Sequence, residues 1–220
     1  MSKPIVIALD GPAASGKGTL ARMIGDTYNF VHLDTGTLYR GVAWVMLDRG
    51  LDPNDAQAAA AIAQNYAIDQ IANADIRTAE IGAAASVVSA NPAVRAALLD
   101  FQRQFAINPP NGAPGAVLDG RDIGTVVCPD ATVKFYVIAS PKVRARRRWQ
   151  ELLPTNPDLK ESHIYNDLLE RDARDEARAN APLKRAADAE LLDTTLLTID
   201  AAFAAARRVI DGAIQQQKSE

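Results

Sequence analysis

The stretch IVIALDGPAASGKGT, residues 5–19, decides the fold of this chain. Its first part, Ile5 to Leu9, is a short apolar run typical of a buried parallel strand, and the residues after it are compatible with a helix. The glycines between them let backbone N–H groups converge on phosphate oxygens, and the helix adds a partial positive charge at its amino end. Strand, loop and helix in this order predict a phosphate-binding loop, in which Lys17 bridges the β- and γ-phosphates of a nucleotide.

One position of this loop departs from the general pattern. Gly18 follows Lys17 where the pattern has Ser or Thr as a magnesium ligand, and Thr19 comes one place later. A loop of this form disfavours GTPases and motor ATPases and looks like that of nucleoside monophosphate kinases. The alternative is a glycine-rich turn with a solvated lysine, which both the spacing and the context disfavour. The residues expected to bind ATP are Gly11, Ala13, Ala14, Ser15, Gly16, Lys17, Gly18, Thr19 and Arg148.

Further apolar runs recur along the chain, with helical stretches between them. They occupy residues 31–33, 116–118, 133–138 and 190–192. This alternation predicts an α/β protein in which a central parallel five-stranded sheet is flanked by helices. Together with the phosphate loop after the first strand, it indicates a P-loop kinase fold. Because crossovers between parallel strands are right-handed, binding sites are expected at the carboxyl ends of the strands.

The composition is that of an ordinary globular protein of 220 residues, with 48% hydrophobic and 23% charged residues. A net charge of -3 argues against affinity of the whole surface for nucleic acid or an anionic membrane, so anion binding must come from local arginine clusters. Cys128 is the single cysteine, and the apolar run at the amino end is too short for a signal peptide or a membrane span. We therefore expect a cytoplasmic protein that binds neither nucleic acid nor membrane. A monomer is the expectation for its assembly, although none of these features bears on it.

The middle of the chain predicts helices. The segment Asp55 to Phe105 is rich in alanine and lacks alternation, with interruptions expected near residues 73–75 and 91–92. Near the end of the chain, Thr198 predicts the cap of a final helix. We expect one domain, residues 1–220, divided into a core of 1–34, 106–143 and 179–220, an acceptor-binding region of 35–105 and a lid of 144–178.

Two strand ends carry polar side chains at the rim where an acceptor should lie. Thr35 and Arg40 follow the second strand, and Asp119, Arg121 and Asp122 follow the third. Two phosphates must be brought together against their mutual repulsion, and arginines with fixed charge and bidentate geometry are the expected means. Arg40 and Arg121 are the candidates. The acidic pair could simply brace a turn, but carboxylates beside a phosphate loop are more often catalytic or magnesium-organising.

The predicted lid is rich in arginine. Residues 144–148 contain four arginines and no acid, and such crowding of like charges favours a bound anion. Arg171, Arg174 and Arg178 follow at spacings of three and four, so a helix would put them on one face, with Asp175 among them. The alternative is a solvated face with internal salt bridges, which neighbouring acids make credible. We expect about half of these arginines to contact ligand.

Taken together, these motifs resemble the bacterial cytidylate kinases, of the nucleoside monophosphate kinase family, over nearly the whole chain. The resemblance is carried by the phosphate loop and by motifs at residues 33–40, 119–125, 129–131 and 170–175. It implies transfer of the γ-phosphate of ATP to CMP, and also to dCMP. It further implies Mg²⁺ held through the nucleotide phosphates and water, with Thr19 and Asp119 as candidate protein ligands.

The resemblance also implies roles for individual residues. Those that would face the cytosine are Ser86, Arg95 and Asp122. Those that would bind the ribose are Thr35, Arg171 and Asp175. Those that would bind the acceptor phosphate are Arg40, Arg121 and Arg178, with Tyr39 beside them. The catalytic residues would be Lys17, Arg121, Asp122 and Arg178. The exocyclic amine of cytosine can donate a hydrogen bond to Asp122 or Ser86. Its N3 and O2 atoms can accept hydrogen bonds from Arg95.

One feature departs from the family, whose members usually carry a small β-rich insertion in the acceptor-binding region. Here residues 67–77 are short and have no strand pattern, so the insertion is expected to be reduced. His32 and His163 lack the spacing of metal ligands and are expected to be structural. The alternatives are a UMP or AMP kinase, a kinase of a small non-nucleotide molecule, and an ATP-binding module without turnover.

Overall fold

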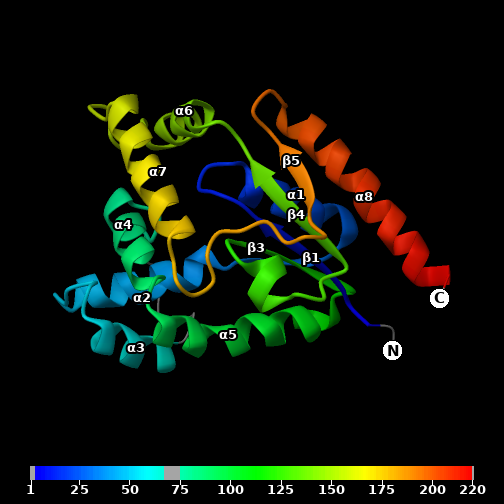
Figure 1. Ribbon diagram of the computed structural model, residues 1–220, viewed down its shortest axis with the longest axis horizontal. Coiled ribbons are helices and arrows are strands. Elements are labelled where there is room, and N and C mark those ends of the chain that lie inside the picture. Colours follow the sequence, from blue (N-terminus) through cyan, green and yellow to red (C-terminus); the bar gives the residue numbers. More distant parts are fainter. Residues whose placement is uncertain (1–2, 67–74, 220) are drawn as a thin grey trace. The chain divides into compact units, whose positions relative to one another are not determined.

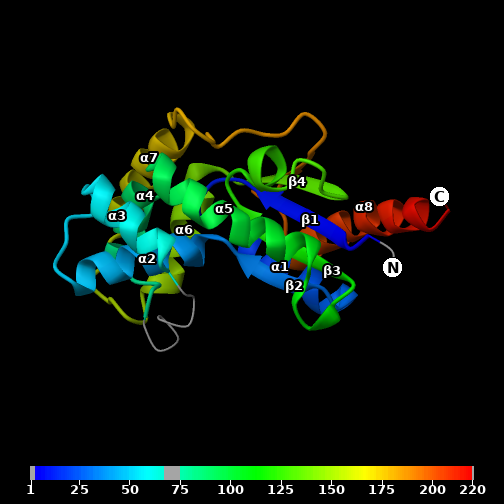
Figure 2. The same cartoon turned by 90° about the horizontal axis from the view of Figure 1, so that it is seen from below.

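The computed structural model of the chain describes residues 3–66 and 75–219 (Figures 1 and 2). It consists of two compact units, Met1–Leu33 with Ala106–Glu220, and Asp34–Phe105. We call them the sheet unit and the helical unit. The phosphate loop, residues 11–19, lies in the sheet unit.

A five-stranded sheet forms the centre of the sheet unit (Figure 1). The strands lie in the order β2 (Val31–Asp34), β3 (Gly115–Gly120), β1 (Ile5–Asp10), β4 (Val133–Ile138) and β5 (Glu190–Asp193). The strand β1 pairs in parallel with β3 and with β4, and β4 pairs in parallel with β5. The central strands are buried on both faces, which is why they read as continuous apolar runs. The prediction of an α/β fold with a parallel five-stranded sheet is confirmed.

Two helices of the sheet unit pack together against the sheet. They are α1 (Lys17–Tyr28), which contacts β3 and β1, and α8 (Ile199–Ser219), which runs beside β5 in Figure 1. Leu20 and Ile24 of α1 and Ile210 of α8 share one core with the buried side of the strands. Thr198 Oγ1 accepts a hydrogen bond from the Ala201 N–H at 3.2 Å, so the predicted cap of the final helix is confirmed.

The other two long helices of this unit pack against each other. They are α6 (Pro141–Leu152) and α7 (Glu161–Glu176), which share the buried side chains of Ala145, Ile164 and Leu168. Short helical turns lie at η2 (Pro110–Gly112), before β3, and at η3 (Ile123–Val127), which follows β3 and is a π-helix.

The described part of the helical unit contains α2 (Gly36–Asp48), α3 (Ala56–Gln64), α4 (Ala79–Val88) and most of α5 (Pro92–Ile107) (Figure 2). Their shared core includes Val42, Met46 and Val88. The predicted interruption at Asn91 is confirmed, because Asn91 Oδ1 accepts from the Ala93 N–H at the start of α5. The interruption predicted near residues 73–75 falls largely outside the described residues, as does most of the reduced insertion at 67–77.

Within residues 3–66 and 75–219, no single helix has both the length and the apolarity needed to cross a membrane. One pair of helices bent by 99°, Ala79–Val88 with Pro92–Gly112, reaches that length and composition together. Ile81, Val88 and Val94 of this pair are buried in the core of the helical unit.

Candidate active site

The phosphate loop joins β1 to α1 and needs glycine at two positions. Gly11 has a φ of +147°, and a Cβ added there would lie 2.0 Å from the carbonyl oxygen of Val137. Gly16 has a φ of +94° and occupies the N-cap of α1, where no described side chain caps the helix. The amino end of α1, where the helix dipole is positive, therefore faces the loop and suits an anion.

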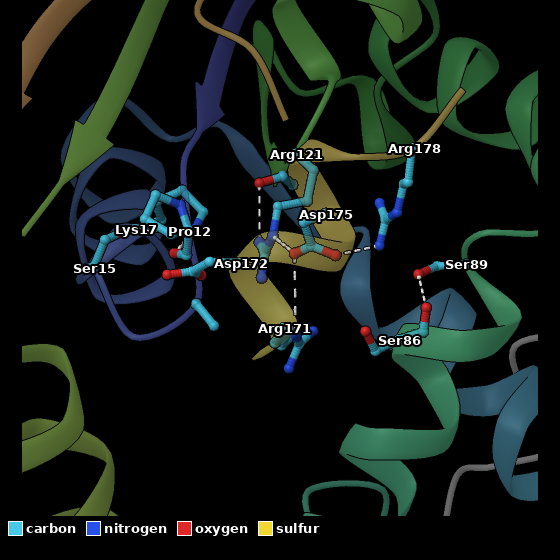
Figure 3. A network of polar contacts seen from close by, with 12 residues as sticks. Pro12, Ser15, Lys17, Ser86, Ser89, Arg121, Arg171, Asp172, Asp175 and Arg178 are labelled. Carbon is cyan, nitrogen blue, oxygen red and sulfur yellow. Dashed lines mark hydrogen bonds and ion pairs between the residues drawn. The ribbon is translucent and has the colours of Figure 1, made fainter. Parts of the chain in front are cut away.

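Lys17 lies back over the loop to which it belongs (Figure 3). Its Nζ donates to the Pro12 carbonyl oxygen at 2.8 Å and to Ser15 Oγ at 3.4 Å, and the residue is only 5% exposed. The ammonium group is thus held at the phosphate loop by the backbone of that loop. This is the position from which it would reach the phosphates of a nucleotide.

A second positive site is centred on Asp175 of α7 (Figure 3). Arg121 Nε donates to Asp175 Oδ2 at 2.9 Å, Arg178 Nη2 donates to Asp175 Oδ1, and Arg171 Nε lies 4.0 Å from Oδ2. Burial alone would raise the pKa of Asp175, but the neighbouring guanidinium groups hold it below its ordinary value. Within this cluster one carboxylate is shared by three guanidinium groups, so the cluster as a whole is positive and suits a phosphate.

The register of the sheet puts Arg121 near the phosphate loop. Asp10, the last residue of β1, is the Cα partner of Gly120, the last residue of β3. Gly11 and Arg121 therefore leave neighbouring parallel strands at the same edge. Asp122, which follows, is buried at 5% exposure. The sheet unit by itself carries both the phosphate loop and the Asp175 cluster at the carboxyl ends of its strands.

One prediction about α7 was wrong. The spacing of the three arginines assumed a helix that continues through Arg178, but α7 ends at Glu176, with Ala177 as its C-cap. Arg178 lies beyond the helix and meets Asp175 from the following turn, whereas Arg174 is exposed. The Leu183 N–H donates to the Asp175 carbonyl oxygen, which folds the chain back over the end of the helix. Only two of the three arginines, Arg171 and Arg178, therefore face Asp175.

Two arginines of α6, Arg144 and Arg148, pair with acids, as the alternative of internal salt bridges predicted. Arg144 is 3% exposed, and it makes two hydrogen bonds to the Asp172 carboxylate and donates to the Ala13 carbonyl oxygen at 3.2 Å. Arg148 pairs with Glu151 at 2.8 Å. A bound anion is therefore not needed to explain the crowding of charge on this helix. Arg144 instead ties both α6 and α7 to the phosphate loop.

Arg147 makes a similar link through Thr194, the residue after β5. Its guanidinium donates to Thr194 Oγ1 at 3.0 Å and to the Thr194 carbonyl oxygen at 2.8 Å. Thr194 Oγ1 in turn lies 2.9 Å from the Ser15 carbonyl oxygen of the phosphate loop. Burial lowers the pKa of Arg147 from its ordinary value, although the group stays charged at neutral pH.

A cavity of about 310 Å³ opens beside the phosphate loop. One wall is made by the loop and the start of α1, including Gly16 and Leu20, and the other by the segment after β5, including Leu197 and Ile199. Arg147 also lines it. Cavities that bind small molecules are mostly apolar with a few placed polar groups, and this one suits the nucleoside part of a nucleotide whose phosphates lie in the loop.

The candidate magnesium ligands lie near residue 18 of the phosphate loop. A Cβ added to Gly18 would lie 3.9 Å from Asp119 Oδ2, and Thr19 follows in the same turn of α1. Asp119 Oδ1 lies 2.6 Å from His32 Nε2, so the carboxylate is oriented by a neighbouring side chain. Mg²⁺ is usually held by one or two carboxylates together with phosphate oxygens and water, and these oxygen donors fit it. Among the described residues, no group of three or more His, Cys, Asp or Glu side chains could hold a metal alone.

The remaining predicted residues belong to the helical unit, where Arg40 of α2 reaches α4 and Ser86 lies on α4. Arg40 Nη1 donates to the Ile76 carbonyl oxygen at 2.9 Å, and a Cβ on Gly82 would lie 3.4 Å from that nitrogen. Ser86 comes one turn after Gly82, so both lie on the same face of α4. Ser86 Oγ is buried and has no hydrogen-bond partner among the described residues. A buried hydroxyl without a partner costs stability, which a ligand that bonds to it would recover.

Tyr39 and Arg95 also meet in the helical unit. The Arg95 guanidinium lies 5.4 Å from the centroid of the Tyr39 ring, and Arg95 Nη1 donates to the Ser89 carbonyl oxygen at 3.2 Å. Thr35, the N-cap of α2, is buried. The helical unit thus contains Thr35, Tyr39, Arg40, Ser86 and Arg95, and the other predicted site residues are in the sheet unit.

A phosphate loop after the first strand of a parallel sheet, with an arginine cluster at the same edge, defines a P-loop phosphotransferase. Comparison with known proteins gives the family. A family model described as cytidylate kinase matches residues 7–211, and the chain belongs to the cytidylate kinase family.

Two relatives illustrate this similarity. A protein of Rhodospirillum rubrum named cytidylate kinase is 55% identical over 206 residues, which cover 94% of this chain and 97% of that protein. Another of the same name, from Afipia carboxidovorans, is 53% identical over 209 residues, covering 95% of this chain and 98% of that protein. A crystal structure of an uncharacterized protein from Eubacterium ventriosum aligns with a TM-score of 0.55 at 13% identity, covering 94% of this chain and 98% of that one. At that identity the likeness shows the fold alone.

Proposed function

We propose that this protein transfers the γ-phosphate of ATP to CMP, giving ADP and CDP, and that it also accepts dCMP. The observation that carries the proposal is that two anion sites lie at one edge of the sheet: the phosphate loop with Lys17, and the Asp175 cluster with Arg121 and Arg178. A kinase that joins two phosphorylated molecules needs both. Membership of the cytidylate kinase family supports cytidine as the nucleoside of the acceptor.

The donor nucleotide would occupy the phosphate loop and the cavity beside it. The N–H groups at the start of α1 would bind the phosphates, and the cavity between Leu20 and Leu197 would take the nucleoside. Asp119 and Thr19 would hold Mg²⁺, which when bound neutralises charge on the donor phosphates. Arg148 is also proposed to bind ATP. We predict that its guanidinium leaves Glu151, with which it pairs in the structure, and binds a phosphate of ATP.

The acceptor would be bound by the residues that the resemblance to the cytidylate kinases assigns to it. Arg121 and Arg178 would bind its phosphate, together with Arg40, and Asp175 and Thr35 would bind the ribose. The cytosine amine would donate to Asp122 or Ser86, and Arg95 would donate to the ring acceptors. The buried Ser86 hydroxyl, which lacks a partner among the described residues, supports its role in reading the base.

The chemical step needs no nucleophile from the protein. An oxygen of the acceptor phosphate attacks the γ-phosphorus, the bond from that phosphorus to the bridging oxygen breaks, and ADP leaves with the electron pair. The acceptor phosphate is already an anion, so no general base is required. Lys17, Arg121 and Arg178 would stabilise the charge spread over the transferring group, and the lid of residues 144–178 would keep water away.

A panel of acceptors tests the proposal. Initial rates with CMP, dCMP, UMP and AMP at a fixed concentration of Mg-ATP should be highest with CMP, as measured by ADP release. An equal or higher kcat/KM with UMP or AMP would assign the chain to another acceptor. ADP release with no nucleotide acceptor, or nucleotide binding without any ADP release, would overturn the proposed reaction.

The proposal extends to the organisation of the chain. It assigns residues 35–105 to acceptor binding and 144–178 to the lid around the core, in a cytoplasmic monomer. Light scattering after size exclusion chromatography tests the monomer, for which the expected mass is 23.5 kDa.

A further inference from the structure

Asp10 holds together two segments that are far apart in the sequence. It is the last residue of β1, only 4% exposed, and directly precedes the phosphate loop. Its Oδ1 accepts from the Ile123 N–H and its Oδ2 accepts from the Gly124 N–H, both at 2.7 Å. These two amides come immediately after Arg121 and Asp122. One carboxylate therefore joins the start of the donor loop to the segment that carries two predicted acceptor residues.

The two amides are the first of the π-helix η3, whose amino end needs a cap. Asp122 occupies the N-cap position but makes no side-chain cap hydrogen bond. Asp10 supplies that bond from a neighbouring strand instead. The direction of the backbone through residues 121–124 is therefore fixed by Asp10 and not by the side chain at the N-cap position.

The contact between Asp10 and η3 leaves little room for a side chain at position 124. A Cβ there would lie 3.3 Å from Asp10 Oδ2 and 3.1 Å from Lys134 Cδ. Lys134 is held in turn, because its Nζ donates to Asp188 Oδ2 at 2.7 Å. The turn at Gly124 is thus enclosed between a carboxylate and the stem of a lysine, and it has little freedom to shift.

A contribution to folding stability does not explain why a carboxylate occupies position 10. Burial raises the pKa of Asp10 to about 6, even though the two N–H groups and Lys17 act to lower it. The ionised group is therefore held at a cost in folding free energy at neutral pH. Buried ionic groups that cost stability are expected where their position serves function.

We propose that Asp10 is a positioning residue of the phosphoryl transfer, and that it sets the place of Arg121 and Asp122 beside the phosphate loop. The inference rests on the proposed function, because these two residues are the ones assigned there to the acceptor. Asp10 acts through the backbone of residues 123–124 and touches neither substrate. Its loss should therefore weaken the use of the acceptor and leave donor binding intact, since the strand pairing of Asp10 with Gly120 still holds the phosphate loop.

The variant Asp10→Asn tests this directly. One of its two oxygens becomes an amide nitrogen, which faces an N–H donor, so one of the two bonds is lost at constant size. Asp26→Asn is the matched control, because Asp26 is exposed on α1. Three quantities are compared with the parent: hydrogen exchange of the amides at positions 123 and 124, the Kd for ATP, and KM and kcat with CMP.

For Asp10→Asn we expect exchange at residues 123–124 to be at least about tenfold faster, kcat/KM for CMP to fall by about 30-fold, and the Kd for ATP to stay within about threefold. Gly124→Ala perturbs the same contact, because the added Cβ would lie 3.3 Å from Asp10 Oδ2. It should give the same three results, and it serves as the test if Asp10→Asn does not fold. Unchanged CMP kinetics in folded variants, or a parallel loss of ATP binding, would overturn the positioning role. Failure of the parent to phosphorylate CMP would instead overturn the proposed function.

Discussion

Replacement of Arg178 by alanine probes the acceptor side of the site most directly. The Arg178 side chain is 6% exposed and donates to Asp175, which is 1% exposed, so its charge acts where water screens it little. Removal of a donor aimed at developing charge costs about 3 kcal/mol, which corresponds to about 100-fold in kcat. Stability should change less, by about 1 kcal/mol or about 2–4 °C in Tm, because Asp175 keeps its bond to Arg121.

The assay is ADP release at saturating Mg-ATP over a series of CMP concentrations. Arg174→Ala is the matched control, since Arg174 lies four residues earlier and is exposed. Its rate should stay within about threefold of the parent. Arg178→Lys separates charge from geometry, because a lysine keeps the charge but loses the planar fork. A rate of Arg178→Ala within about threefold of Arg174→Ala would remove Arg178 from the phosphate-binding set.

Three further predictions concern other parts of the chain. Ser86→Ala should lower kcat/KM for CMP by about tenfold without lowering Tm, because its buried hydroxyl has no described partner to lose; CMP titrations and thermal unfolding check this. Arg144→Met should lower the free energy of unfolding in urea by about 3 kcal/mol, because Asp172 would keep a largely buried charge without its bidentate partner. The folded pKa of Asp10, about 6, lies above its ordinary value of 3.8, so the native state binds one more proton than the unfolded chain between these values. The stability of the parent relative to Asp10→Asn should therefore fall by about 3 kcal/mol as the pH rises from about 4 to about 7, and urea titrations at each pH measure it.

The sequence predicts those parts of the fold that depend on neighbouring residues. Buried parallel strands are apolar along their length, and the glycines of the phosphate loop are required by backbone geometry at Gly11 and Gly16, so both could be read from short stretches. The helical unit follows from alanine-rich segments with capping residues such as Thr78 and Asp55. These features are local, and local patterns suffice for them.

The contacts that organise the site are not local. Arg144 meets Asp172 across 28 residues, and Asp10 meets Ile123 across 113, so no spacing rule could have joined them. The error at Arg178 has a related cause. No glycine or proline marks the end of α7 at Glu176, and the residues that turn the chain back act through a bond between Leu183 and Asp175. The base-reading residues proposed for the helical unit stay predictions, because they rest on resemblance.

The hydrogen bond from Lys17 to the Pro12 carbonyl oxygen bears on the thermodynamics of nucleotide capture. The ammonium group has already given up most of its hydration in the folded chain, where it is 5% exposed. When a triphosphate binds to the loop, the ammonium group exchanges a carbonyl oxygen for a phosphate oxygen. It therefore loses little further hydration water on binding. The free-energy cost of dehydrating this charge is thus met during folding and not during binding. The attraction between Lys17 and the phosphate therefore contributes more to the affinity than it would for a hydrated lysine.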